Sequence, residues 1–428
     1  MKEYIKTHLP CSVVSFIQYL IRNFVKFCEY ISVLCQPIRF KKSLIKLRDK
    51  QVYNVAFFVV HSSVWKYDFL YQLMQQHKKF KPLIVICPVV NYGKENMQME
   101  IERNIQYFEQ KGYDMICAYD IKTGRYLDIK KEVEIDIIFY TNPYKYLIDR
   151  RYYIDKFLDK FTCYVPYSAS VCCDSSQFRL SFYSMLSKFY LENTLSQQIA
   201  KREMLNKARN TKVVGFPVLD AIFDNSVRRD VWKHPQKFKI IWAPHHSFDA
   251  GCSIHFSSFL QVSDCMLKIR NRYKKDIQIA FKPHPLLYIK LLNLWGKGKT
   301  DEYYQAWADG ENSQYEDSEY VDLFRTSDAM IFDSVSFIYE YLYTQKPSLF
   351  IYSNSIDEQL NDFGKAALQC HQFAVSVSDI EKFILQVINQ AQDPLQEKKK
   401  AFFQNNIVPP NAKTASENIL MDLLSVLS

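Results

Sequence analysis

The chain alternates short, continuous apolar runs with longer segments in which apolar residues recur at helical spacing. Continuous apolar runs are typical of buried parallel strands, and their alternation with helices predicts a doubly wound α/β unit. Residues 177–208 are expected to form one or two helices. In the first half, strands are expected at 53–60, 82–90, 113–119, 135–141 and 161–167, with a further short strand from residue 211.

The same alternation restarts after a polar segment that contains Pro235. Strands are expected at 238–244, 277–283, 327–333 and 347–352, with a helix at 256–275. Two doubly wound domains facing a cleft correspond, by fold analogy, to a GT-B-like architecture. The predicted divisions are an N-terminal helical segment at 1–50, an acceptor-side Rossmann-like domain at 51–232 and a donor-nucleotide-binding domain at 233–428.

The segment 11–35 is apolar at helical spacing but is interrupted by Arg22, Lys26 and Glu29. It therefore lacks the uninterrupted apolar core of a signal peptide or a spanning helix. Two interpretations are open. The helix could dock on the protein core, or it could lie on the cytoplasmic leaflet of a membrane, helped by the basic residues of 41–48 that follow it.

Composition narrows the class of protein. The 428 residues are 48% hydrophobic and 24% charged, which is typical of a globular chain long enough for two domains. The net charge of +9 suits an anionic partner such as a phosphate, a nucleotide or a lipid head group, and no nucleic-acid-binding signature accompanies it. The 11 cysteines form no CxxC pair, so a reduced cytoplasmic location is expected.

Three predicted strands of the second half end in residues that could bind an anion. Because the carboxyl ends of parallel strands meet at one edge of a sheet, these residues are expected to face the same cleft. The third group also begins a helix, whose free N–H groups favour phosphate. The residues are His245 and His246 after the first strand, Lys282 and His284 after the second, and Asp333, Ser334 and Ser336 after the third.

Each group has a structural alternative. A single histidine is more often a structural residue than a catalyst, and Asp-Ser-x-Ser before a helix is more often a plain N-cap. His245 and His246 are adjacent, so on an extended chain their side chains are expected to point apart. No further ligands at suitable spacing accompany them, and no metal or cofactor is predicted.

The second half resembles the CDP-glycerol glycerophosphotransferases, the teichoic acid primase and polymerase family, over roughly residues 210–355. The resemblance rests on "IIWAPHHS", "FKPHP" and "EYVDLFRTSDAMIFDSVSFIYEYLYTQKPSLFI". In the first half it is looser and rests on "VAFFVVHSSVWKYDFLY" and "CYVPYS".

The resemblance implies roles for individual residues. His284 would contact the donor diphosphate with support from Lys282, and His245 and His246 would line the donor pocket. Glu340 would contact a donor hydroxyl, although it could equally be an exposed helix residue. Asp333 belongs to the same predicted donor site, and Ser334 and Ser336 would bind phosphate at the helix N-terminus.

The sequence also departs from the family. The His-Gly-Thr motif thought to supply the catalytic base is missing, because its counterpart at 165–170, "VPYSAS", has no histidine. The nearest substitute is His61 after the first strand, which could also be structural. Val335 is bulkier than the residue often found at its position.

The implied function is transfer of glycerol phosphate, or a related polyol phosphate, from a CDP-linked donor to a hydroxyl of a lipid-linked or polysaccharide acceptor. The protein would work at the inner face of the cell membrane, in cell-surface polymer synthesis. Two alternatives are a GT-B glycosyltransferase that uses a nucleotide sugar, and a degenerate, non-catalytic relative in a capsule-synthesis complex.

Overall fold

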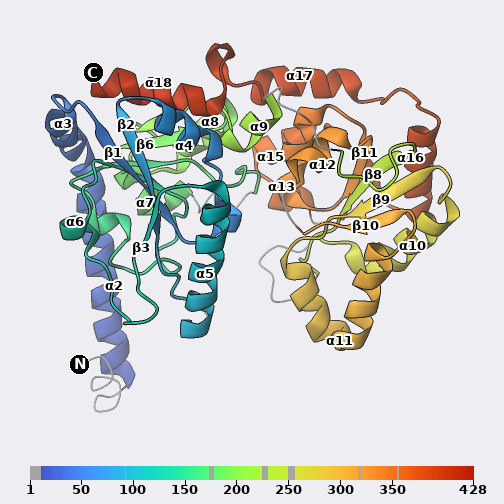
Figure 1. The fold of residues 1–428 in the computed structure, drawn as a ribbon, viewed down its shortest axis with the longest axis horizontal. Coiled ribbons are helices and arrows are strands. Elements are labelled where there is room, and N and C mark those ends of the chain that lie inside the picture. The colour runs from blue at the N-terminus through green and yellow to red at the C-terminus, as the bar shows by residue number, and fades with distance from the viewer. Residues whose placement is uncertain are drawn as a thin grey trace.

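The computed structural model describes residues 11–91, 93–172, 178–223, 230–248, 256–317, 320–353 and 356–428, and contains two parallel sheets (Figure 1). The strand order is β3-β2-β1-β4-β5-β6-β7 in the first sheet and β10-β9-β8-β11-β12-β13 in the second. We call the parts built on these sheets the first unit and the second unit. The predicted α/β class, with two doubly wound units, is confirmed.

The strands are short and mostly buried. In the first sheet they are β1 (Tyr53–Val59), β2 (Phe80–Ile86), β3 (Met115–Cys117), β4 (Ile137–Tyr140), β5 (Phe161–Tyr164), β6 (Lys188–Leu191) and β7 (Thr211–Val213). In the second they are β8 (Phe238–Ala243), β9 (Ile277–Phe281), β10 (Ser313–Tyr315), β11 (Ala329–Phe332), β12 (Ser348–Ile351) and β13 (Gln372–Ala374).

Helices connect the strands and form both ends of the described chain. In the first unit they are α2 (Cys11–Leu34), α3 (Gln36–Leu47), α4 (Asp68–Gln76), α5 (Gly93–Lys111), α6 (Ile129–Glu132), α7 (Ser181–Met185), α8 (Thr194–Glu203) and α9 (Asp220–Phe223). After β8 they are α10 (Phe259–Arg272), α11 (Leu286–Ala308), α12 (Val321–Thr326), α13 (Val335–Glu340), α14 (Ile356–Gln359), α15 (Asp362–Leu368), α16 (Val377–Ile388), α17 (Gln396–Asn406) and α18 (Ala415–Leu427).

Three strands were not expected from the sequence. β6 lies inside the segment 177–208, which was predicted to be helical, and that part of the prediction is wrong. Its four residues are too few to show a period of two, so only pairing with β5 and β7 identifies them as a strand. β10 and β13 are three-residue edge strands, and the same reason applies.

The C-terminal helix α18 returns to the first unit. The carboxylate of Asp422 accepts a hydrogen bond from the hydroxyl of Tyr190 in β6 at 3.0 Å. It also forms an ion pair with Lys212 in β7 at 2.7 Å. Tyr53 in β1 donates to the carbonyl of Leu427 at 3.3 Å. The sequence prediction grouped all C-terminal helices with the second unit; the contacts of α18 lie with the first sheet (Figure 1). The predicted boundary near residue 232 stays a prediction.

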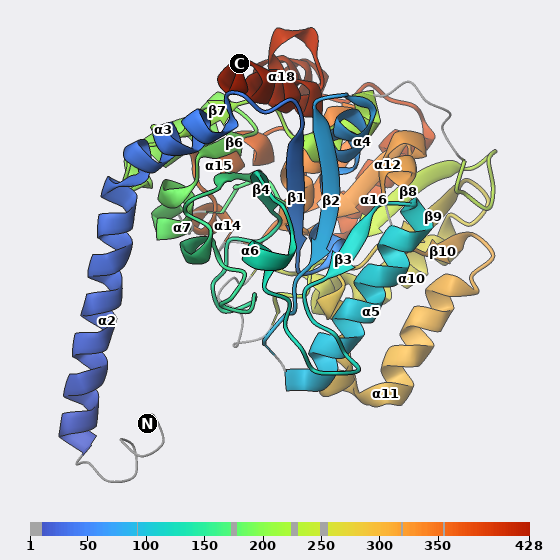
Figure 2. The same ribbon diagram turned by 60° about the vertical axis from the view of Figure 1, so that its left-hand side comes forward.

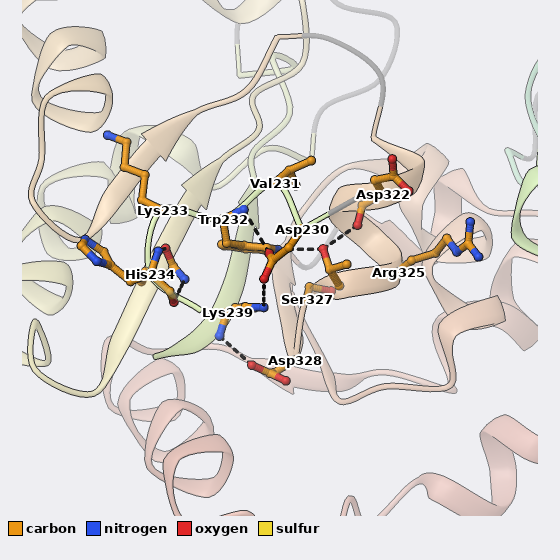
Figure 3. Close-up of polar contacts among 12 residues, drawn as sticks. Asp230, Val231, Trp232, Lys233, His234, Lys239, Asp322, Arg325, Ser327 and Asp328 are labelled. Atoms are coloured by element: carbon orange, nitrogen blue, oxygen red, sulfur yellow. Dashed lines mark hydrogen bonds and ion pairs between the residues drawn. The ribbon is translucent and has the colours of Figure 1, made fainter. Parts of the chain in front are cut away.

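The segment before β8 docks at the amino ends of the second sheet (Figure 3). Asp230 pairs with Lys239 at 3.1 Å, and the Trp232 indole donates to Thr326 at 2.9 Å. The backbone N–H of Lys239 donates to Asp328 at 2.7 Å. This network lies at the sheet edge opposite the strand ends that carry the predicted site.

Helix α2 extends away from the rest of the structure (Figure 2). Its apolar side chains are exposed: Phe16 is 60% and Phe24 67% accessible, whereas Val33 near its end is buried. The helix is attached through Glu29, which pairs with Lys145 at 2.9 Å. The helix is therefore not docked on the core along its length. None of the described helices combines the length and apolar character needed to cross a membrane.

Candidate functional site

The carboxyl ends of β8 and β9 bring three histidines together. These strands pair in parallel, and the N–H of His284 donates to the carbonyl of Pro244 at 3.0 Å. The ring centroids of His245 and His246 are 4.3 Å apart, and that of His284 lies 4.7 and 4.2 Å from them. The expectation that His245 and His246 point apart is wrong, because β8 ends at Ala243 and the chain turns before the histidines.

Imidazoles this close could bind either a transition metal or an anion. Their candidate ligand atoms lie within 4.8 Å of one another. However, Nδ1 of His284 accepts the backbone N–H of Leu286 at 3.1 Å, so the proton of the neutral ring is on Nε2. A nitrogen that carries a proton donates to an anion and cannot ligate a metal.

The charges around the cluster also favour an anion. Burial, together with charge repulsion from His246, Lys290 and Lys282, lowers the pKa of His284 to about 3. Burial likewise holds the pKa of His245 well below its ordinary value. The cluster thus offers neutral donors beside lysine ammonium groups, which is suitable for a diphosphate.

Lys282 directly follows β9, two residues before His284, and only 8% of its surface is exposed. Burial lowers its pKa to about 8, while Glu316 and Asp317 act in the opposite direction. Its Nζ is 6.0 Å from the ring centroid of Tyr320. Lys282 is therefore a largely buried ammonium group near neutral pH, and the carboxylates of Glu316 and Asp317 compensate part of its charge.

Asp333 follows β11 and anchors the loop that carries the histidines. Its carboxylate accepts the backbone N–H groups of His245 at 2.5 Å and Ser258 at 2.7 Å, and the hydroxyl of Ser257 at 3.1 Å. Burial raises its pKa to about 7 despite these bonds. Asp333 thus positions the backbone of His245. The predicted contact between Asp333 and the donor stays a prediction.

The serines precede and begin the short helix α13. Ser334 is buried at the N-cap and its hydroxyl makes no capping bond, while Ser336 is half-buried in the first turn. Both therefore sit at the carboxyl edge of β11, next to Asp333. Val335 is 8% exposed and belongs to the hydrophobic core.

Glu340, at the end of α13, is not an exposed helix residue. Only 3% of its surface is accessible, and its carboxylate accepts the hydroxyl of Tyr320. Burial raises its pKa, and the nearby Lys66 opposes this. Lys66 belongs to the first unit, and its Nζ lies 5.7 Å from the ring centroid of Tyr320. Lys282 contacts the same ring, so residues from both units meet at Tyr320.

The sequence prediction missed Lys66 and Tyr320. Lys66 follows β1 within the quoted segment "VAFFVVHSSVWKYDFLY", and a basic residue just after a central strand was the available signal. Nothing in the spacing indicated that Tyr320 would join Lys66 to Glu340, since 254 residues separate Lys66 from Tyr320 along the chain.

On the first unit, His61 follows β1 and contacts Glu100 in α5, a third residue that the sequence prediction missed. Nδ1 of His61 is 2.8 Å from the Glu100 carboxylate. The segment 165–170, predicted to replace the family's base motif, follows β5 and carries no titratable group other than Tyr167. Burial raises the pKa of Tyr167. His61 is thus the one histidine that the described first unit places directly after a sheet strand on this side.

Comparison with known proteins identifies the fold and the family. The wall teichoic acid polymerase TagF, in a structure with CDPG, aligns over 95% of this chain and 98% of its own, with 13% identity and a TM-score of 0.57. UDP-GlcNAc 2-epimerases from Neisseria meningitidis and Methanocaldococcus jannaschii align over 87% of this chain and all of theirs, at 12% identity, with TM-scores of 0.52 and 0.53. These likenesses establish a GT-B-type fold. None of the curated proteins is significantly similar in sequence.

The family model described as CDP-glycerol:poly(glycerophosphate) glycerophosphotransferase matches residues 172–425, which is more than half of the chain. This span includes the whole second unit with its histidine cluster. The family resemblance noted in the sequence is confirmed. The chain therefore belongs to the CDP-glycerol:poly(glycerophosphate) glycerophosphotransferase family and is a transferase of that kind.

Proposed function

We propose that this chain transfers glycerol phosphate, or a related polyol phosphate, from a CDP-linked donor to a hydroxyl of a lipid-linked or polysaccharide acceptor, releasing CMP. The observation that carries this proposal is the cluster of His245, His246 and His284 at the carboxyl edge of the second sheet, where the charge of Lys282 acts on His284. This is the edge at which open α/β sheets bind ligands.

Phosphoryl transfer depends mainly on positioning and on stabilising the charge of the phosphoryl oxygens. Nε2 of His284 carries a proton and donates it in a hydrogen bond to the donor diphosphate. The ammonium group of Lys282 supplies positive charge, and His245 and His246 complete the wall. Because Lys282 is buried and the three histidines are half-buried, their interaction with an anion is screened less than at the open surface.

The remaining predicted residues act around this centre. Ser334 and Ser336 offer hydroxyls to phosphate, and Asp333 holds the loop of His245 in place. Glu340 accepts a hydrogen bond from a donor hydroxyl, which replaces or joins the bond from Tyr320.

The donor is tested by thermal unfolding of the purified chain with CDP-glycerol, CDP-ribitol, CMP, UDP-glucose and GDP-mannose, since a ligand that binds the native state raises its melting temperature. A shift with cytidine nucleotides alone, followed by CMP release in the presence of acceptor, supports the proposal. A shift with UDP-glucose or GDP-mannose instead favours a nucleotide-sugar transferase. No shift with any of them favours a non-catalytic relative.

We also propose that α2 and α3 attach the protein to the inner face of the cell membrane. The exposed apolar side chains of α2 would enter the interface, and the cations of α3 and its C-cap would contact anionic head groups. These cations are Lys41, Lys42, Lys46 and Arg48.

Sedimentation with anionic vesicles tests this attachment. Replacing Phe16 and Phe24 by Glu should leave the protein in the supernatant, whereas replacing Lys78, an exposed lysine near β2, by Ala should not. If the double variant sediments as well as the wild type, the proposed attachment is wrong.

A further inference from the structure

The contact between His61 and Glu100 fixes which nitrogen of the imidazole carries the proton. The distance from Nδ1 to the carboxylate is 2.8 Å, and the hydrogen bond from His61 holds the pKa of Glu100 below its ordinary value. A carboxylate can only accept, so Nδ1 must donate. Nε2 of the neutral ring therefore presents a lone pair, which is the arrangement of a histidine base oriented by a carboxylate.

Helix α5 holds this arrangement rigidly. Asn104, one turn after Glu100, donates to the carbonyl of Val60 at 2.9 Å, and Arg103 pairs with Glu100 at 2.7 Å. Glu100 and Asn104, on one face of α5, thus bind two consecutive residues of the chain, His61 and Val60. The side chain of Glu100 is 12% exposed and that of His61 is 24% exposed, so the imidazole stays accessible while its partner is shielded.

The loop that carries His61 also reaches the donor side. Lys66, five residues later, lies over the ring of Tyr320, whose hydroxyl binds Glu340. Lys282, after β9, contacts the same ring. The connection between β1 and α4 and the residue after β9 therefore both reach Tyr320. Helix α5 lies on the side of the first unit that faces the second (Figure 1).

From these contacts we infer that His61 and Glu100 form a catalytic dyad in which His61 is the general base for the acceptor hydroxyl and Glu100 is its positioning residue. This inference rests on the proposed transfer reaction. The inference assigns the catalytic base that the segment 165–170, which has no histidine, does not supply. The two residues of the dyad are 39 positions apart along the chain.

The step balances as follows. The acceptor hydroxyl gives its proton to Nε2 of His61 while its oxygen forms a bond to the phosphorus of the polyol phosphate. The bond from that phosphorus to the oxygen bridging it to CMP breaks, and CMP leaves with the electron pair. His61 then carries a proton on both nitrogens, which Glu100 stabilises, and it returns the extra proton to solvent.

Steady-state CMP release tests the dyad in the full-length chain. Removal of a general base lowers the rate about 10²- to 10⁴-fold, so His61→Asn should lower kcat by that factor while the CDP-glycerol thermal shift is kept. Glu100→Gln should lower kcat about 10-fold or more with little change in the donor KM. Glu100→Asp, which keeps the carboxylate, should have a kcat between those of Glu100→Gln and the wild type. The matched control is Glu102→Gln, an exposed residue on the same helix.

Two outcomes distinguish a failure of the proposed dyad from a failure of the proposed transfer reaction. If the wild type releases no CMP from CDP-glycerol, the proposed function fails. If the wild type is active and His61→Asn matches it, the dyad is wrong while the function stands. Nitrogen NMR of histidine-labelled protein needs no turnover: the His61 signal, assigned by its loss in His61→Asn, should show a proton on Nδ1 only, and a proton on Nε2 of the neutral ring would overturn the inference.

Discussion

The two units present different chemistry at their facing strand ends. The second unit gathers three histidines with ring centroids 4.2 to 4.7 Å apart, and the charge of Lys282 acts on one of them, whereas the first unit offers one oriented histidine and Lys66. An activated donor carries its negative charge on the diphosphate, so the donor side needs many donors and cations. The acceptor contributes a neutral hydroxyl, for which one base is sufficient. Under the proposed reaction, this asymmetry matches the charges of the two substrates.

On the donor side, the largest effect is expected from His284→Ala. Loss of one buried donor to a developing oxyanion lowers kcat about 10²- to 10³-fold. CMP release measures it, and His234→Ala is the matched control because His234 lies at the opposite end of the sheet, bonded to the carbonyl of Glu311 (Figure 3). Equal losses of kcat in His284→Ala and His234→Ala would contradict a specific role for the histidine cluster.

A smaller effect with a distinct pH dependence is expected from Lys282. Since its pKa is lowered to about 8, the ammonium group is present near pH 7 and is lost as the pH rises through 8. The KM for CDP-glycerol should therefore rise above pH 8 in the wild type. Lys282→Arg should abolish this rise, and Lys282→Gln should raise KM about 10-fold at pH 7, in line with a charge-assisted hydrogen bond. A flat pH profile in the wild type would contradict the prediction.

The packing between the two units can be weakened by a substitution that changes neither the histidine cluster nor the pair of His61 and Glu100. A Cβ at Gly364 would collide with the carbonyl oxygen of Val171, so Gly364→Ala should lower the free energy of unfolding by about 1–3 kcal/mol. Thermal unfolding measures it. The control is Gly298→Ala in α11, where an added Cβ meets no atom within 4 Å; it should leave stability unchanged or slightly raise it.

The smallest effect should come from Lys66, which links the two sides. Its contact with the Tyr320 ring is partly exposed, and such contacts contribute about 0.5–1 kcal/mol. Lys66→Ala should reduce kcat/KM about 2- to 5-fold, and Lys78→Ala should leave it unchanged. A loss as large as that of His284→Ala would mean that Lys66 contacts the transferred phosphate directly, and the two sides would be more alike than the structure indicates.

Most of the fold, and the meeting of the strand-end histidines at one sheet edge, could be predicted from sequence. Buried parallel strands are continuous apolar runs, and the residues that end them share one edge of the sheet, so His245, Lys282 and His284 were found by local pattern alone. β6, β10 and β13 could not be predicted in this way, because strands of three or four residues carry no period.

The chain by itself determined the α/β class, the two-unit organisation and the strand-end residues, since each depends on neighbours a few positions apart. Only the tertiary structure decided that Asp333 anchors a loop, that Glu340 is buried against Tyr320, that most apolar side chains of α2 are exposed, and that Glu100 orients His61. These features depend on side chains brought together from distant positions, and local periodicity contains no information about such contacts.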